Sequence, residues 1–164
     1  MIIDGICVSR WGAVGSLIAA LWLSADLGAK AMAADGLTTI KSAYGAQETM
    51  ARLEAAVAAK GMTVFAHIDH AAGAAEAGLP LRPTDLLIFG SPKGGTPVMQ
   101  SIQTAGMDLP LKALVWQDEA GTAWLSYNTP AWIAERHGVD AKAAIHGMTL
   151  AIDAIAVAAT SPNQ

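Results

Sequence analysis

The sequence predicts one small α+β domain, with a mixed or antiparallel sheet and helices packed mainly on one of its faces. Three observations predict it. Segments with the period-two pattern of strands alternate with segments whose apolar residues recur every three to four positions. Two of the predicted strands are joined by a short turn that is typical of an antiparallel hairpin. The stretch from residue 34 to residue 164 has a length that suits a single hydrophobic core.

The N-terminal segment has a composition of its own. An apolar run without charges extends from Trp11 to Leu23, which is shorter than the roughly 20 residues of a spanning helix. It is followed by Ala31-Met32-Ala33, whose small first and third residues suit a signal peptidase. We therefore expect residues 1–33 to be a signal peptide that is cut between Ala33 and Ala34. The mature protein would then be periplasmic or secreted, and an uncleaved anchor is the alternative.

The first half of the domain shows three strand patterns and two helix patterns. Its first strand alternates only loosely, as edge strands can, and the following helix has apolar residues at helical spacing. The third strand is a short continuous apolar run, which is typical of an inner strand covered on both faces. The predicted elements are an edge strand at 38–44, a helix at 46–60, a strand at 62–69, a short helix at 71–77 and an inner strand at 85–89.

The second half is punctuated by prolines and glycines. Thr96-Pro97 and Thr129-Pro130 each place a capping hydroxyl before a proline, which predicts that helices begin at Pro97 and Pro130. These helices would end at Gly106 and at His137-Gly138. Asp140 is predicted to cap a last, alanine-rich helix. The remaining elements are strands at 111–117 and 122–127, joined by a turn at 118–121 and paired antiparallel.

Charge and cysteine content exclude several classes of protein. The chain has ten Lys and Arg against 14 Asp and Glu, and neither sign forms a run. A nucleic-acid surface would need a basic patch, and a membrane-surface helix would need a basic amphipathic stretch. We therefore expect no nucleic-acid partner and, after cleavage, no membrane association. The single cysteine, Cys7, lies in the predicted signal peptide, so the mature domain cannot form a disulfide.

Four short motifs occur together between residues 69 and 114. They are Asp69-His70, Leu81-Arg82-Pro83, Pro92-Lys93-x-Gly95-Thr96-Pro97 and Leu111-Lys112-Ala113-Leu114. In this combination the sequence resembles the family called domain of unknown function 302, over about residues 38–139. The resemblance implies a small α+β fold and a tendency to form homo-oligomers, and it implies no settled reaction. Ser91 departs from the asparagine that is usual in the family.

The glycine-rich segment Gly90–Thr96 is the first candidate ligand site. A strand-to-helix turn exposes backbone N–H groups near a helix N-terminus, where anions are favoured, and Lys93 would add a positive charge. The segment lacks the Gly-Lys-Ser/Thr ending of a nucleotide-binding P-loop. The alternative is a tight turn whose glycines serve only the backbone. The candidate ligand-binding residues here are Lys93, Gly94, Gly95 and Thr96.

Asp69 and His70 at a strand end complete the candidate site. A histidine beside a carboxylate can act as a general base or as a proton-linked ligand contact. Adjacent strand residues point to opposite faces, however, so that His67 and Asp69 share a face while His70 does not. The alternative is that His70 caps the following helix, and the pattern alone leaves both roles open.

Three classes of function remain open. The preferred one is an exported module that binds a small molecule, with an anion among the candidate ligands. The second is an enzyme or a haem or metal protein that uses His70 and Lys93, although no spacing of His and Met supports ligation and the sequence identifies no cofactor. The third is a structural interaction protein that uses an aromatic surface around Trp116, Trp124, Tyr127 and Trp132.

Overall fold

The computed structural model describes residues 36–162. The predicted signal peptide and its cleavage point therefore lie outside the described residues. The described part folds as an α+β domain with five strands, five α-helices and one 3₁₀ turn. In chain order these elements are β1 (Leu37–Lys41), α1 (Ala46–Ala59), β2 (Thr63–Asp69), α2 (His70–Glu76), β3 (Thr84–Gly90), α3 (Pro92–Ser101), η1 (Gln103–Met107), β4 (Leu111–Gln117), β5 (Ala123–Asn128), α4 (Pro130–His137) and α5 (Lys142–Thr160).

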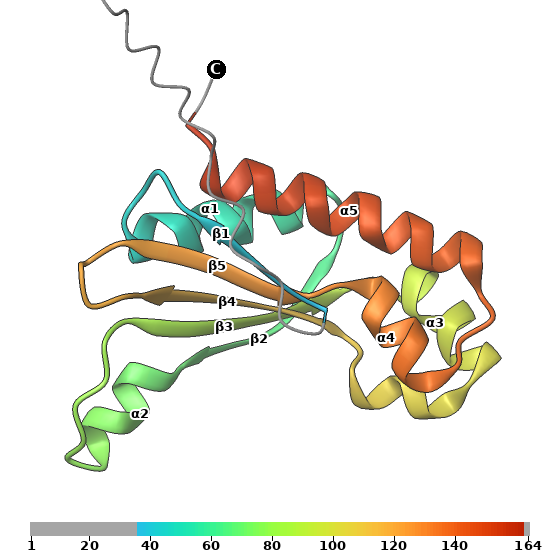
Figure 1. The fold of residues 1–164 in the computed structure, drawn as a ribbon, viewed down its shortest axis with the longest axis horizontal. Coiled ribbons are helices and arrows are strands. Elements are labelled where there is room, and N and C mark those ends of the chain that lie inside the picture. Colours follow the sequence, from blue (N-terminus) through green and yellow to red (C-terminus); the bar gives the residue numbers. More distant parts are fainter. Residues whose placement is uncertain (1–35, 163–164) are drawn as a thin grey trace, which may run out of the picture.

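The five strands form one antiparallel sheet in the order β1-β5-β4-β3-β2. The predicted hairpin of β4 and β5 is confirmed, and the first strand lies at an edge as expected. Helices α1 and α5 cover one face of this sheet, while α3 and α4 lie together near one end of it (Figure 1). The short helix α2 projects from the opposite end.

Strand alternation explains which face the helices cover. In β4 the residues Leu111, Ala113 and Val115 are buried, and the residues between them are only half-buried. The covered face meets the apolar stripe of α1, in which Leu53 and Val57 are fully buried. Ile152 and Ile155 of α5 complete this single core.

The opposite face of the sheet, which we call the open face, carries the other half of each strand. Strand alternation and register place apolar side chains there, including Leu86 and Leu114 at half-buried positions and Ile68, which is 39% exposed. The expectation that β3 is covered on both faces is therefore wrong. The rings of Trp116 and Trp124 stack on this face with their centroids 6.0 Å apart.

Two predicted helix starts differ from the structure. Helix α3 begins at Pro92, five positions before the predicted Pro97, because Ser91-Pro92 supplies an earlier proline for the first helical position. The N–H groups of Gly94 and Gly95 both donate to the carbonyl of Ser91, which draws the glycines into the helix. Pro97 therefore lies inside α3, where it cannot donate to a carbonyl one turn earlier.

The last two helices test the predicted caps. Thr129 caps α4 as expected, since its side chain accepts the N–H of Trp132 at 3.2 Å. Gly138 ends this helix in the left-handed conformation that favours glycine. Asp140 does not cap α5, however: the cap residue is Ala141 and the helix begins at Lys142.

Tyr127 of β5 gives the fold a dependence on alkaline pH. Burial and a hydrogen bond from its hydroxyl to Asp153 at 2.8 Å raise the pKa of Tyr127 far above its ordinary value of 10.0. The contribution of the protonated Tyr127 hydroxyl to stability is therefore complete below the pKa of tyrosine in the unfolded chain. It is lost as the pH rises from that value toward the higher pKa of the folded state. Between about pH 9 and about pH 11 we expect the free energy of unfolding of the wild type to fall more than that of Tyr127→Phe. Urea unfolding at both pH values measures the two losses. Equal losses in both proteins would contradict this assignment.

Candidate functional site

The glycine-rich candidate segment borders a pocket at one end of the sheet. We call it the α3 pocket; its volume is about 260 Å³. It lies where β2 and β4 begin and β3 ends, and α3 and α5 close its other sides. The lining residues are Met62, Phe65, Gly90, Ser91, Pro92, Gly94, Gly95, Thr96, Met99, Leu109, Pro110, Leu111 and Met148.

The lining of the α3 pocket is mostly apolar and has no charged side chain. Thioethers of Met62, Met99 and Met148 contribute soft, adaptable surface. Phe65 lies at a β-bulge in β2 and remains 55% exposed, so its ring borders the pocket without being part of the core. The lining would suit an apolar ligand or an apolar part of one.

The anion-binding geometry expected from the glycines is only partly present. Pro92 has no N–H group, and those of Gly94 and Gly95 already donate to Ser91 within the helix. The side chain of Ser91 makes no capping hydrogen bond. Lys93 is exposed between two lining residues and does not itself line the pocket. Positive charge at this end therefore comes from Lys93 more than from a nest of backbone donors.

The structure places Asp69 and His70 at the other end of the sheet. Thr63, the first residue of β2, pairs with Gly90, whereas Asp69 pairs with Asp85. A strand of seven residues spans about 20 Å, so the two halves of the predicted site do not come together. Because of this separation His70 and Lys93 cannot act together at one site, as the enzyme hypothesis requires. Antiparallel pairing is the reason, because the two segments follow strands that run in opposite directions.

Local roles account for Asp69. Its carboxylate accepts the N–H of Ala72 at 2.7 Å and so caps α2, a role that the sequence left open for His70. His70 is the first residue of that helix and is exposed.

His67, which was not among the candidate site residues, holds a more connected position than His70. Its Nδ1 lies 3.1 Å from Glu54 of α1, and its Nε2 lies 3.2 Å from Asp85 of β3. Both contacts can be hydrogen bonds donated by the ring only when the imidazole is protonated. They border a polar hollow that also includes Asp69 and Gln117. The shared face of His67 and Asp69 was the sequence signal for this arrangement.

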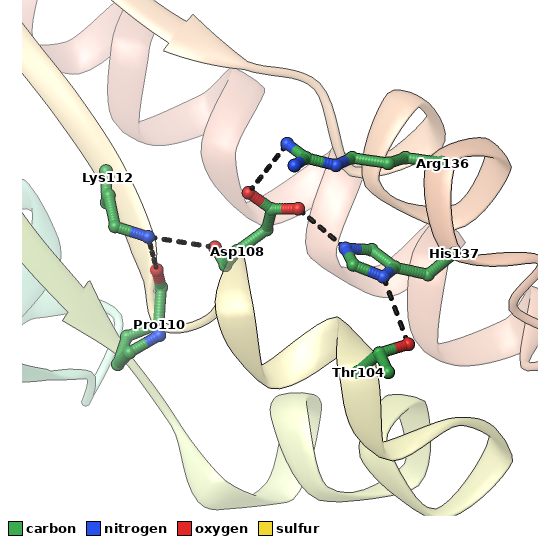
Figure 2. Close-up of polar contacts among 6 residues, drawn as sticks. All are labelled: Thr104, Asp108, Pro110, Lys112, Arg136 and His137. Carbon is green, nitrogen blue, oxygen red and sulfur yellow. Dashed lines mark hydrogen bonds and ion pairs between the residues drawn. The ribbon is translucent and has the colours of Figure 1, made fainter.

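A second polar cluster was missed by sequence reasoning. Figure 2 shows Asp108, which follows η1, facing Arg136 and His137 at the end of α4. Its carboxylate lies 2.6 Å from Nε2 of His137 and 3.4 Å from the guanidinium of Arg136. The other ring nitrogen of His137 lies 3.2 Å from the hydroxyl of Thr104. In the sequence His137 marked only the end of a helix, and no local pattern links it to a residue 29 positions away.

The hydroxyl, imidazole and carboxylate of this cluster resemble the order of a catalytic triad. Thr104 lines neither the α3 pocket, nor the polar hollow beside His67, nor the hollow beside Trp132. Lys112 donates to the carbonyls of Asp108 and Pro110, which ties β4 to the same turn (Figure 2). The cluster thus joins η1, α4 and β4.

Metal ligation can be assessed only for the part of the chain that the structure describes. Within residues 36–162 no group of three or more His, Cys, Asp or Glu side chains is arranged to hold a metal ion. None of the histidines lines the α3 pocket.

The fold and pocket define a class: small α+β proteins with a five-stranded antiparallel sheet and helices on one face. The chain belongs to the family named Domain of unknown function DUF302, whose model matches residues 38–155. This confirms the resemblance found in the sequence. The match extends further toward the C-terminus than residue 139 and includes most of α5.

A solved structure agrees with this fold. The chain is similar to an uncharacterized conserved DUF302 protein from Bacillus stearothermophilus, with a TM-score of 0.70 and 23% sequence identity. The similarity covers 77% of this chain and 99% of that one. At this identity it supports the fold.

Curated relatives carry another name. The chain is 49% identical over 115 residues to proteins named Fluoride-specific ion channel FluC 1 from Brucella suis and from Brucella abortus. The matched part is 69% of this chain but only 45% and 43% of those proteins, so the chain spans less than half their length.

Among residues 36–162, α5 alone is long and apolar enough to cross a membrane by length and composition. Its Ile152, Ile155 and Ala159 are buried in the core of the domain.

Proposed function

We propose that this domain is a binding module for a small molecule and that the α3 pocket is its site. The observation that carries the proposal is the pocket itself, which forms at the segment Gly90–Thr96 that the sequence had singled out. Five elements (β2, β3, α3, β4 and α5) and the connections before β2, α3 and β4 supply its walls, and its lining is mostly apolar with a few polar groups. Concave apolar sites with few polar groups are typical of small-molecule binding.

The two glycines of α3 support this proposal. Glycine inside a helix costs roughly 0.5–1 kcal/mol relative to alanine. A Cβ on Gly94 would lie 3.7 Å from Met148, and one on Gly95 would lie 3.8 Å from Met99. These are ordinary contact distances, so packing does not forbid a side chain at either position. The glycines instead keep the pocket open, at some cost to helix stability.

Filling the pocket tests this function. Gly95→Leu places an alkyl group in the α3 pocket and is expected to weaken binding of the neutral fluorescent probe N-phenyl-1-naphthylamine by roughly tenfold or more. Gly147→Leu in α5 is the matched control, because a Cβ there meets nothing within 4 Å. Probe titration should show unchanged binding in that control. Equal binding by both variants, with both folded by circular dichroism, would exclude the pocket as the site.

A second candidate function comes from the curated relatives. We propose that the chain acts beside a fluoride-specific ion channel, since it is 49% identical to part of proteins that carry this name. Fluoride is small and strongly hydrated, so an apolar pocket is poorly suited to bind it. An accessory role is thus favoured over direct fluoride binding. Cells lacking the chain should be more sensitive to fluoride, and unchanged sensitivity would argue against this role.

We also propose that the mature domain is exported and forms homo-oligomers through the open face. The apolar side chains of that face support this, because such surfaces mark protein contacts when contiguous. Ile68→Lys should shift the protein to a smaller species in light scattering coupled to size-exclusion chromatography. Leu150→Lys is the control, since Leu150 lies on α5 and is already 59% exposed. A wild-type monomer at all concentrations would contradict self-association.

The N-terminal sequence of the mature protein tests the export proposal. A mature N-terminus other than Ala34 would contradict the cleavage site.

A further inference from the structure

We infer that the ligand of the α3 pocket is an amphipathic anion, with an alkyl or similarly apolar tail in the pocket and a carboxylate-like head beside Lys93. This inference rests on the proposed function and specifies its ligand class. Three observations support it: the apolar lining, the positive charge of Lys93 beside the pocket, and the side chain of Ser91, which makes no capping hydrogen bond.

The lining sets the character of the tail. Three methionines and Phe65 border the pocket together with Leu109. Methionine side chains adapt to ligands of irregular shape, and none of these side chains carries a charge or a strong hydrogen-bonding group. A charged group placed deep in this pocket would lose its hydration without compensation. The interior therefore selects an apolar group.

The surroundings of the helix start set the character of the head. Pro92 and Gly94 both line the pocket, so the exposed Lys93 between them lies at its border. A lysine ammonium on its flexible four-carbon stem can follow a ligand head group. No acidic side chain lines the pocket, so nothing in the lining would offset the attraction of Lys93 for an anion.

Ser91 provides a hydroxyl in the same place. It is the N-cap residue of α3 and lines the pocket, yet its side chain makes no capping hydrogen bond. Its hydroxyl can therefore donate to a ligand oxygen. A carboxylate at this position would also lie near the positive end of the helix dipole. The charge and the hydroxyl together favour an anionic head over a neutral or cationic one.

Competition between ligands of equal chain length tests the inference on the full chain. Decanoate, decanol and decyltrimethylammonium would each displace N-phenyl-1-naphthylamine from the wild type. We expect decanoate to be the best competitor, and its affinity to rise roughly fourfold for each methylene added across shorter carboxylates until the pocket is full. The same series separates the contribution of the tail from that of the head.

A lysine variant isolates the head. Lys93→Met keeps an unbranched side chain and removes its charge, and it should abolish the preference for decanoate over decanol while the affinity for decanol stays the same. Lys41→Met on the distant edge strand β1 is the matched control and should retain the preference.

The outcomes distinguish the two proposals. If the probe binds in the wild type and is lost in Gly95→Leu, but decanoate shows no advantage over decanol, the pocket is a ligand site and the anionic head is wrong. A preference that persists in Lys93→Met also overturns the assigned head site. If neither the probe nor any of the three compounds binds, the proposed function itself fails.

Discussion

Replacing Phe89 by alanine is expected to lower the free energy of unfolding by about 4 kcal/mol, the largest effect we predict for a single side chain. Phe89 is fully buried in β3, on the face of the sheet that α1 and α5 cover. Its removal leaves a cavity that neighbouring strands can fill only in part, since Val64 and Leu111 are held in register on either side. Urea unfolding followed by circular dichroism measures the difference.

The chain provides a matched control for this substitution. It contains two phenylalanines, and Phe65 is 55% exposed at the bulge of β2. Phe65→Ala should cost less than about 1 kcal/mol. Because Phe65 borders the α3 pocket, the same variant should bind the naphthylamine probe less tightly. A similar loss of stability in both variants would show that the core does not depend on Phe89 as the structure indicates.

Replacing Asp108 by alanine is the second large effect, with an expected loss of about 2 kcal/mol. The change removes the acceptor that His137 contacts at 2.6 Å, and the side chain of His137 is only 9% exposed. It also removes the partner of Arg136 on the same carboxylate. The contacts that join η1 to α4 would then be weakened at a place where water reaches His137 poorly.

Two comparisons make this prediction specific. Asp140→Ala is the control, because the contact recorded at Asp140 is made by its backbone N–H to Ser101 and survives the substitution. The double variant Asp108→Ala/His137→Ala should lose less stability than the sum of the single losses, since the two residues share one contact. Additive losses would show that the pair contributes nothing as a pair.

Much of the secondary structure was predictable because its determinants are local. The apolar spacing of Met50, Leu53 and Val57 predicted both the helix and its buried face, and all three are buried in α1. Thr129 before Pro130 predicted the start of α4, which depends on one hydroxyl and one proline. The hairpin of β4 and β5 was predictable for the same reason.

Helix α3 shows where local reasoning is ambiguous. Ser91-Pro92 and Thr96-Pro97 are two similar start signals in succession, and the glycines between them are typical of a loop. The structure uses the earlier signal. Val98 is fully buried in the core, and packing of this kind can stabilise a helix despite its glycines.

The candidate site was predictable only in its glycine-rich half. Gly94, Gly95 and Thr96 do line a pocket, but its other walls include Met62 and Met148, which are 86 residues apart in the sequence. Asp69 and His70 lie beyond reach of these residues at the far end of the sheet. The pair of Asp108 and His137 had no sequence signal at all.

The sequence by itself thus determined the type of most elements, the buried face of α1 and the family to which the chain belongs. These properties depend on residue spacing and on contacts within a few positions. Only the tertiary structure decided which ends of the strands meet, which side chains enclose the α3 pocket and which partner His137 finds. Those properties depend on pairing between distant segments. If one strand ran in the opposite direction beside its neighbour, its last residue would lie at the other end of that strand.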